Sequence, residues 1–469
     1  MTRLNLCIAI GVLLAAGCAS TSEPTNKLVV STSNQINDRA GPATVTQAGH
    51  QEPLSAELLQ PPTVIESTES NLEIDVSPDI SQTGTLTLEA LEQLALANSP
   101  AIAQQNARIS ALRGKWVQVG LAPNPTVGYV AGEVGNEGAA GQQGGFIGQD
   151  FITGKKLLRN RAIVAAEIAQ AEQELAAVQR RVTTDVRHGY YGTLLAQRRV
   201  HLAGEFVHVT GKAVEASKAL FEAEEVPLVG LLQTEVQQQK AQLLLKTAQN
   251  SLEQSWRRLS TSTGGSELQM QPLVGDISKI PESIEWEHQL VRLKTESPEV
   301  AIAMANVDRA RHALNRACVD AVPDISTQLS VQYDDSTNNT IAGVQIGLPI
   351  PLWNRNQGGI RQAQAEVSEA IRNADRVELN LQGRLANAFQ QYADAYVTTD
   401  SYASNILPRA QKTFELVERG YQQGEVGYLD VLTAQRTFSQ SNLEYLDALE
   451  SLWKSYVRID GLLLEGGLE

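Results

Sequence analysis

Apolar and small residues recur at steps of three and four along the second half of the chain. The positions that follow this spacing are Ile360, Ala363, Val367, Ala370, Ala374, Val377, Leu381, Leu385, Ala388, Tyr392 and Ala395. Such steps form the heptad pattern of a coiled coil, and the alanines allow helices to approach closely. The first half begins the same seam at Ile168, Ala171, Leu175, Val178 and Val182. We expect a helix over residues 158–221, roughly 90 to 100 Å long at about 1.5 Å per residue.

Alternation of polar and apolar residues predicts four strands, two in each half of the chain. The first pair covers residues 126–134 and 145–152, joined by the Gly-rich loop 135–144, and the second covers residues 324–333 and 341–350. In the third strand, one face consists of Ile325, Thr327, Leu329, Val331 and Tyr333, and the other of Ser326, Gln328, Ser330 and Gln332. One apolar face suits a barrel wall between lipid and water, and also a soluble hairpin packed on a core.

Both halves present the same order of elements, which indicates an internal two-fold repeat. Ser-Pro pairs at 99–100 and 297–298 open helical stretches, and Pro125 and Pro323 follow them at equal distances. The helix before the first strand is expected over residues 86–121. Each half then continues with two strands, a very long helix, a short turn and a long helix. The predicted domains are the first repeat over 84–265, a linker over 266–284 and the second repeat over 285–465.

The number of strands is too small for one chain to form a barrel. Small barrels begin at about eight strands, and four strands leave two open edges. Three copies of the chain would supply twelve strands and two copies eight. The strand count therefore suggests assembly of several copies, with three favoured and two still possible.

The N-terminus has the pattern of a bacterial lipoprotein signal peptide over residues 1–17. Arg3 is its only charge, residues 4–14 are apolar, and small residues precede Cys18. Cleavage would leave Cys18 as a lipidated first residue; an ordinary signal with an incidental cysteine is the alternative. Residues 18–83 are rich in Ser, Thr, Pro, Gln and Asn and predict an irregular tether.

The net charge argues against nucleic-acid binding, and the lack of catalytic motifs argues against an enzyme. The formal net charge of −15 repels phosphate backbones. Gly154-Lys155 resembles a phosphate loop only in part, because Gln149 stands at its first glycine and Lys156 at its Ser/Thr position. No nucleophile elbow, zinc helix or dinucleotide fingerprint occurs. We therefore predict no enzyme, no catalytic residue and no cofactor.

Histidine spacing gives no metal site either. His188, His201 and His208 share one predicted helix, but two imidazoles without neighbouring carboxylates or thiolates bind metal poorly. A structural or solvated role is the expectation for all three.

The chain resembles the TolC-like outer-membrane efflux family, and more closely its heavy-metal branch, the CzcC/CusC-like outer-membrane factors. The resemblance covers residues 86–464. Its local marks are Leu-Ala-Pro-Asn-Pro at 121–125 and Pro-Ile-Pro-Leu-Trp-Asn-Arg-Asn-Gln-Gly at 349–358. At 153–156 the chain has Thr-Gly-Lys-Lys where the family often has Gly-Gly-Lys-Arg.

This resemblance implies an α+β membrane protein: a homotrimer with a twelve-stranded outer-membrane β-barrel, four strands per chain, continued by a long α-helical coiled-coil tunnel in the periplasm. Such a protein would be a passive duct, lipid-anchored in the bacterial outer membrane and docked to a periplasmic adaptor (a membrane fusion protein) and an inner-membrane RND pump. The branch implies heavy-metal cations as substrates. Drugs or other small organic molecules are one alternative, and a periplasmic coiled-coil scaffold lipoprotein is another.

Residues 424–432 resemble the signature at the tunnel tip of this family. The turn between paired helices would meet the adaptor there, although simple capping of a helix–turn–helix explains the same residues. Pro227 replaces the usual small hydroxyl residue in the corresponding turn of the first repeat. The residues expected to dock an adaptor are Val226, Pro227, Leu228, Val426, Gly427 and Leu429.

Asp430 follows the tip and would form a ring of three carboxylates at a periplasmic gate in a trimer. Such a ring attracts cations, whereas a solvated aspartate near a helix N-terminus is equally compatible with the sequence. Tyr129, Tyr333 and Trp353 lie at predicted strand ends, as in the aromatic girdles of membrane barrels. Ordinary packing between strands and helices is the alternative for these three.

Overall fold

The structure, a computed structural model, describes residues 86–135, 138, 140–224, 226–265, 268–279 and 283–466, except the side chain of Gln422. The described residues belong to one compact unit, Asp79–Glu469. The predicted signal peptide, Cys18 and the predicted tether lie outside them.

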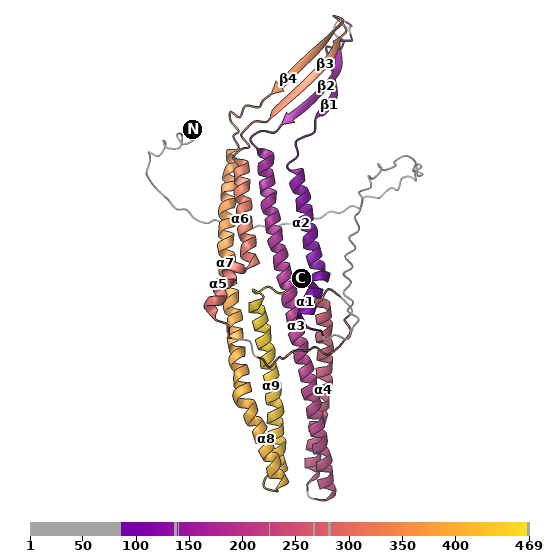
Figure 1. The fold of residues 1–469 in the computed structure, drawn as a ribbon, viewed down its shortest axis with the longest axis vertical. Coiled ribbons are helices and arrows are strands. Elements are labelled where there is room, and N and C mark those ends of the chain that lie inside the picture. Colours follow the sequence, from indigo (N-terminus) through magenta and orange to yellow (C-terminus); the bar gives the residue numbers. More distant parts are fainter. Residues whose placement is uncertain are drawn as a thin grey trace, which may run out of the picture. The chain divides into compact units, whose positions relative to one another are not determined.

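Four strands and a set of long helices make up this unit (Figure 1). The first half contains α1 (Leu88–Asn98), α2 (Pro100–Gln118), β1 (Thr126–Gly132), β2 (Gln142–Phe151), α3 (Lys156–Glu222) and α4 (Leu228–Ser262). The second half contains α5 (Trp286–Glu296), α6 (Pro298–Ala317), β3 (Ile325–Asp334), β4 (Asn339–Gly347), α7 (Gln357–Ser401), the π-helical segment η2 (Tyr402–Ile406), α8 (Leu407–Gln422) and α9 (Tyr428–Asp460). The sheet continues from one end of α2, α3, α6 and α7, and the α3–α4 and α8–α9 turns lie at the opposite end.

The four strands form one antiparallel sheet in the order β1-β2-β3-β4. Pairing between β2 and β3, from Gln142↔Asp334 to Phe151↔Ile325, joins the two halves of the chain. The predicted strands exist, but their bounds differ. β2 begins at Gln142, within the predicted loop, directly after the positive-φ turn residue Gly141. β4 ends at Gly347, before Pro349, which has no N–H to donate to a ladder.

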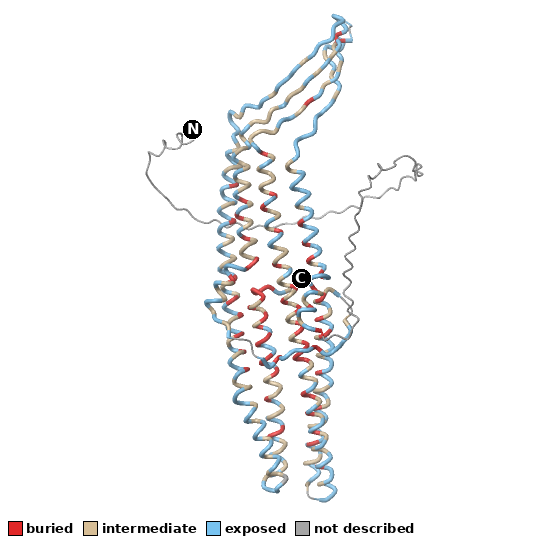
Figure 2. Tube along the Cα trace, in the orientation of Figure 1, coloured by how far each residue is buried: buried red, intermediate tan, exposed pale blue. Residues whose placement is uncertain are grey.

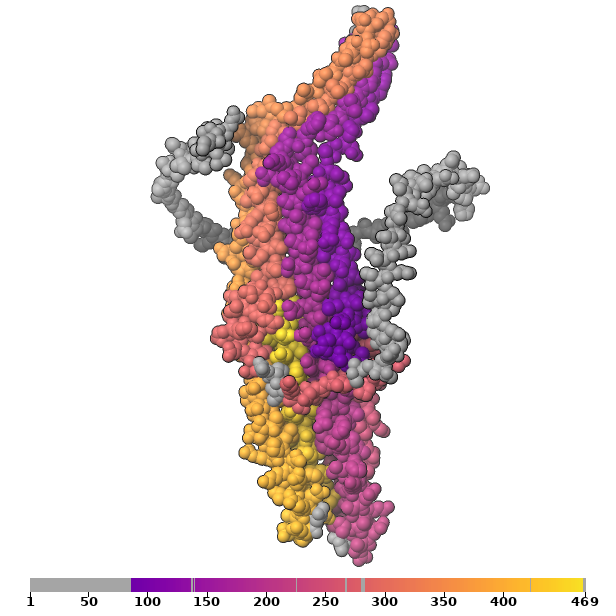
Figure 3. Space-filling view, in the orientation of Figure 1, coloured from indigo at the N-terminus to yellow at the C-terminus, as the bar shows by residue number. Residues whose placement is uncertain are grey.

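The predicted seams face the helix partners. Of these positions, the structure buries Ala171, Val182, Ala363, Ala370, Leu381, Leu385, Ala388, Tyr392 and Ala395. Helix α6 packs between α3 of the first half and α7 of its own half (Figure 3). Arg159 Nη1 of α3 donates to the Asn315 carbonyl of α6 at 3.0 Å. Asn356 Nδ2, directly before α7, donates to the Ala317 carbonyl of α6 at 2.9 Å. Heptad spacing thus produced long rods with narrow contacts.

Prolines divide two helices that the sequence pattern predicts as continuous. The helix expected over 86–121 is two helices, because Ser99 is extended before Pro100 (φ −65°, ψ 119°), and the same break separates α5 from α6 at Ser297. In the second half, α7 passes into η2, which ends at Ile406, and α8 begins at Leu407 with Pro408 as its second residue. A π-turn is a common response to a missing backbone donor within a long helix.

The largest core lies midway along the helices, where the C-terminal segment returns to them (Figure 2). Leu91, Val186, Leu259 and Leu449 belong to one apolar cluster there, and Leu381, Leu385, Leu452, Leu462 and Leu463 belong to a second. Leu462 and Leu463 hold positive φ angles of 56° and 61°, which is unusual for bulky residues. Packing of their buried side chains offsets this backbone strain.

Gly461 permits the approach of this segment to α3. A Cβ at Gly461 would lie 2.2 Å from Thr184 Oγ1 and 3.0 Å from Thr184 Cγ2. We predict that Gly461→Ala lowers the free energy of unfolding by about 1 to 3 kcal/mol through overpacking. Urea denaturation of the detergent-solubilised protein measures the loss. Because Thr184→Ala removes both clashing atoms, the double variant should recover part of it; simple additivity of the two substitutions would contradict this explanation.

Candidate functional site

One face of the sheet is apolar and lacks a covering layer within the described residues. The register aligns Val127, Ile147, Leu329 and Val344 in a single row across all four strands. All four side chains are exposed, Val127 by 79% and Val344 by 71%. The same face carries Tyr129, Phe151, Val331, Tyr333 and Ile346, all exposed. A contiguous apolar surface of this kind marks an interface with lipid or with another apolar surface.

The opposite face of the sheet is mainly polar. Ser326, Gln328, Ser330 and Gln332 of β3 lie on it, in alternation with the apolar set. Phe146, Val130 and Ile341 are the larger apolar residues on this face. The Phe146 ring covers Gly128 of β1, where a Cβ would lie 2.5 Å from Phe146 Cε1. The sheet therefore separates an apolar side from a polar side.

Both outer edges of the sheet are open within the described residues. β1 pairs only with β2, and β4 pairs only with β3. Each edge presents unpaired backbone N–H and C=O groups, which are a template for pairing with another strand.

The three predicted girdle residues occupy two levels of the sheet. Tyr129 and Tyr333 lie toward the loop end, where Tyr129 Oη donates to Gln143 Oε1 at 3.1 Å and Tyr333 Oη to Asn338 Oδ1 at 2.6 Å. Trp353 follows β4 at the helical end and is 86% exposed. The structure thus does not bring the three together; it separates two tyrosines from the tryptophan.

The helix turns at the other end place the predicted docking residues at two tips. Val226, Pro227 and Leu228 connect α3 to α4, and Val426, Gly427 and Leu429 surround the start of α9. Leu228 is 51% exposed and Leu429 64%. Val426 is partly covered, because its side chain packs against Gly420: a Cβ added to Gly420 would lie 3.2 Å from Val426 Cγ2.

Asp430, the predicted gate residue, has a structural role in this chain. Its Oδ2 accepts the backbone N–H of Gly427 at 3.1 Å, while its own N–H donates to the Gly427 carbonyl at 3.0 Å. A carboxylate at the third helical position satisfies a free donor and complements the helix dipole. The capping role and the gate role are compatible, because one oxygen is used by the cap.

Sequence reasoning missed a charged hub at the C-terminal end of α9. Arg187 contacts Glu92 and Asp460, each at 2.5 Å, and Arg292 contacts Asp460 at 3.3 Å. Arg384 donates to the Leu463 carbonyl at 2.6 Å. These arginines come from α3, α5 and α7, and Arg292 also donates to the Asp460 carbonyl at 3.0 Å. Together they hold the C-terminal end of α9 and the segment that follows it. The sequence signal that could have indicated this hub is an arginine next to a residue of the apolar seam, as at Arg384-Leu385.

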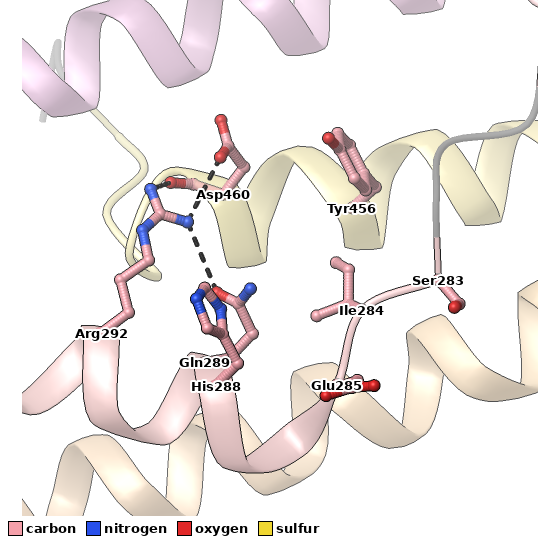
Figure 4. A pocket seen from close by; sticks show the side chains of 8 residues that line it. All are labelled: Ser283, Ile284, Glu285, His288, Gln289, Arg292, Tyr456 and Asp460. Atoms are coloured by element: carbon pink, nitrogen blue, oxygen red, sulfur yellow. Dashed lines mark hydrogen bonds and ion pairs between the residues drawn. The ribbon is translucent and has the colours of Figure 1, made fainter.

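A recess of about 320 Å³ adjoins the hub between α5 and α9 (Figure 4). Arg292, His288 and Glu285 line it, but the Arg292 guanidinium is directed at Asp460 and at Gln289 Oε1. The described residues contain no group of three or more His, Cys, Asp or Glu side chains able to hold a metal ion. The recess is therefore part of the hub rather than a separate binding site.

The predicted histidines lie apart along α3. His188 is next to the hub, with Nε2 3.8 Å from Glu465 Oε2, whereas His201 pairs with Glu205 on an exposed surface. Burial lowers the pKa of His188 below 6.5 and outweighs the nearby carboxylates of Glu465 and Asp185. His188 is therefore neutral in the folded protein at neutral pH.

Stability should fall in acid through His188. Its folded pKa lies below the unfolded value, so the unfolded chain binds the proton more readily, and the folded state loses stability as the pH falls below about 6.5. We predict that His188→Gln flattens the pH dependence of the urea midpoint between pH 7 and pH 5. His201→Gln, on the same helix but exposed, should leave the wild-type slope; equal slopes in all three proteins would refute the assignment.

The two tips end their helices with different residues at the left-handed position. Gly424 has φ +74° and closes α8, with Glu425 N–H donating to the Gly420 carbonyl at 2.8 Å. Glu224 holds φ +62° at the end of α3. We predict that Gly424→Ala destabilises the protein by about 1 kcal/mol, whereas Glu224→Asn stabilises it slightly, because asparagine tolerates this conformation. Urea midpoints of both variants test the prediction, and a gain from Gly424→Ala would contradict it.

Comparison with known proteins gives one consistent result. The family model described as "Outer membrane efflux protein" matches residues 91–265 and 290–463. The chain is 27% identical to the cobalt-zinc-cadmium resistance protein CzcC of Cupriavidus metallidurans over 385 residues, 81% of this chain and 90% of that protein. A 177-residue match, 29% identical and covering 36% of this chain and 35% of the relative, is to the cation efflux system protein CusC of Escherichia coli K12.

Solved structures share the fold. The outer-membrane channel OprN superposes with a TM-score of 0.67 at 17% identity, covering 81% of this chain and 90% of that chain. None of the helices in the described residues combines the length and apolar character that a bilayer-crossing helix requires. The matched ranges include both strand pairs and all the long helices, and the relatives are efflux proteins rather than enzymes. The chain belongs to the outer membrane efflux protein family.

Proposed function

We propose that this protein is the outer-membrane duct of a tripartite, RND-type efflux system. The observation that carries the proposal is the sheet: one face is apolar and exposed, the other is polar, and both edges are open. In a bilayer every backbone donor and acceptor needs a partner within the protein. Pairing of β4 from one copy with β1 of the next would satisfy both edges.

Three copies form the proposed assembly. Twelve strands would close a barrel wide enough for a lumen, whereas eight leave room for little beyond side chains. The polar face would line that lumen, and the helices that continue from each strand pair would extend it as a periplasmic tunnel. We retain the proposed division into signal peptide 1–17, tether 18–83, repeats 84–265 and 285–465 with linker 266–284, and lipidation at Cys18.

The two tips are the proposed docking surface for a periplasmic adaptor, with the pump beyond it in the inner membrane. Leu228 and Leu429 support this role, because each exposes about half or more of its surface at a turn where nothing in the described chain covers it. Apolar side chains at the end of a rod suit contact with the tips of a second coiled coil.

Heavy-metal cations are the proposed substrates. Similarity to a cobalt-zinc-cadmium resistance protein and to a cation efflux system protein supports this class, and the net charge of −15 is favourable for cation passage. Drugs and other small organic molecules are the alternative, since a wide duct accepts what its pump delivers.

Two measurements test the duct and its substrate. Trimers in the detergent-extracted outer-membrane fraction that conduct ions in planar bilayers are expected; a soluble monomer that leaves vesicles impermeable would refute the duct. Deleting the gene should reduce tolerance to zinc, cobalt, cadmium or copper. Reduced tolerance to antibiotics alone would favour the organic-substrate alternative.

Asp430 provides a test of the proposed gate. We predict that Asp430→Ala raises conductance in a planar bilayer and weakens block by multivalent cations, because three carboxylates around one axis create a cation-binding ring. The same substitution also removes the cap on Gly427. Asp430→Asn separates the effects, because an amide oxygen can still accept the Gly427 N–H without the charge.

Block should weaken in both Asp430 variants if the carboxylate charge acts at the aperture. Weakened block in Asp430→Ala alone would assign the effect to the lost cap, and unchanged block in both would remove Asp430 from the gate.

A further inference from the structure

Basic and aromatic side chains gather where the helices meet the sheet. We define the junction belt as Lys155, Arg159, Arg161, Arg355 and Arg361 together with Trp116 and Trp353. The belt residues stand at the sheet-proximal ends of α2, α3 and α7 (Figure 1). These ends form one level of the molecule, because the chain passes from each of them directly into or out of a strand.

Contacts across the helix ends make the belt continuous. Asn356, at the start of α7, donates to the Ala317 carbonyl and to Asp320 Oδ2, at the end of α6. From there Arg316 donates to Asn160 Oδ1 of α3 at 2.7 Å. On the far side of α3, the Arg161 guanidinium lies 4.5 Å from the centre of the Trp116 ring.

The belt carries unneutralised positive charge in an acidic protein. Two carboxylates at this level are already used: Asp320 pairs with Arg316, and Asp324 pairs with Lys156 at 2.9 Å. The five basic belt residues form no ion pair with any carboxylate of the described chain, and Nε of both Arg159 and Arg161 is buried there without a hydrogen-bond partner. The positive charge of this level contrasts with the net charge of the whole chain, which is −15.

Apolar residues lead from the sheet into the belt. Val344 and Ile346 of β4 continue the apolar face, and the alternation extends past the ladder to Leu348 and Ile350, both exposed. A turn follows, with Leu352 N–H donating to the Ile350 carbonyl at 2.9 Å, and then Trp353. Tryptophan prefers the boundary between hydrocarbon and headgroups. The belt therefore stands at headgroup depth if the apolar face contacts lipid.

We propose that the junction belt binds the headgroup phosphate of an anionic glycerophospholipid, of the phosphatidylglycerol type, in the leaflet nearest the helices. This proposal rests on the membrane placement in the proposed function. Planar guanidinium groups match phosphate oxygens in pairs, and Arg355 and Arg361, which are exposed and form no ion pair within the described chain, supply such groups around the start of α7. Trp353 and the apolar segment 348–352 lie directly before Arg355 in the chain and suit the acyl chains of the same lipid.

Lipid retention tests the belt. Wild-type protein is reconstituted in nanodiscs with equal phosphatidylglycerol and phosphatidylcholine, extracted in mild detergent, and the co-purified lipids are quantified by mass spectrometry. We expect phosphatidylglycerol to be enriched by about fivefold or more, the ratio that a single basic side chain near an anionic surface provides. The exposed belt variant Lys155→Gln/Arg355→Gln/Arg361→Gln should lose most of this enrichment.

A matched control has the same change of charge far from the sheet. Lys218→Gln/Lys240→Gln/Lys246→Gln alters three exposed lysines on α3 and α4, away from the sheet, and should retain the wild-type enrichment. Equal retention of both lipids by the wild type, equal loss in both variants, or full displacement of the lipid by millimolar inorganic phosphate would each overturn the proposal. Conductance in pure phosphatidylcholine separates the two hypotheses: enrichment without conductance leaves the belt intact and refutes the duct.

Discussion

The open edges and the exposed apolar face of the sheet are the constraint on which the rest of the structure depends. β1 and β4 each leave one edge unpaired within the described residues, and Val127, Leu329 and Val344 expose an apolar row that no described element covers. In water both features favour aggregation; in a bilayer they favour closure with further strands. The sequence pattern of the strands therefore favours the proposed assembly, in which lipid would cover the apolar face and further copies of the chain would pair with both edges.

The helices form long, thin rods that contact one another along narrow seams. Alanines such as Ala171, Ala370 and Ala388 let neighbouring helices approach closely, but a seam this narrow buries little apolar area per residue. Stability is concentrated instead at mid-length, where Gly461 allows the end of α9 to press against Thr184 and arginines from three helices satisfy that end. The tips, remote from this hub, have helix caps and small local contacts, such as that between the Tyr421 and Tyr428 rings, whose centroids are 5.7 Å apart. In the proposed duct, a rod held firmly in the middle and lightly at its end would leave the tips freer to move than the centre.

Local patterns in the sequence were sufficient for the elements and insufficient for what joins them. Heptad spacing predicts α3 nearly to its ends, and period-two alternation predicts all four strands and their apolar face. The errors have local physical causes. Pro100 and Pro408 interrupt helices that the periodicity alone treats as continuous, and the turn at Gly141 ends the predicted loop early, so that β2 begins at Gln142. The hub is different in kind. Asp460 contacts Arg187 and Arg292, which are far from it in the sequence, because the fold brings α9 next to α3 and α5. Local residue spacing cannot predict such a long-range contact.

The two tips differ in the residues that form their turns and in the backbone freedom those residues allow. Gly424 and Gly427 give the α8–α9 turn a relaxed left-handed cap and a close backbone approach for Asp430, whereas Glu224 and Pro227 hold the α3–α4 turn in a more strained and more rigid form. Proline restricts its own φ and that of its predecessor, so the first turn has less freedom to rearrange. In the proposed duct, the α8–α9 hairpin, which carries Asp430, would therefore rearrange more easily than the α3–α4 hairpin.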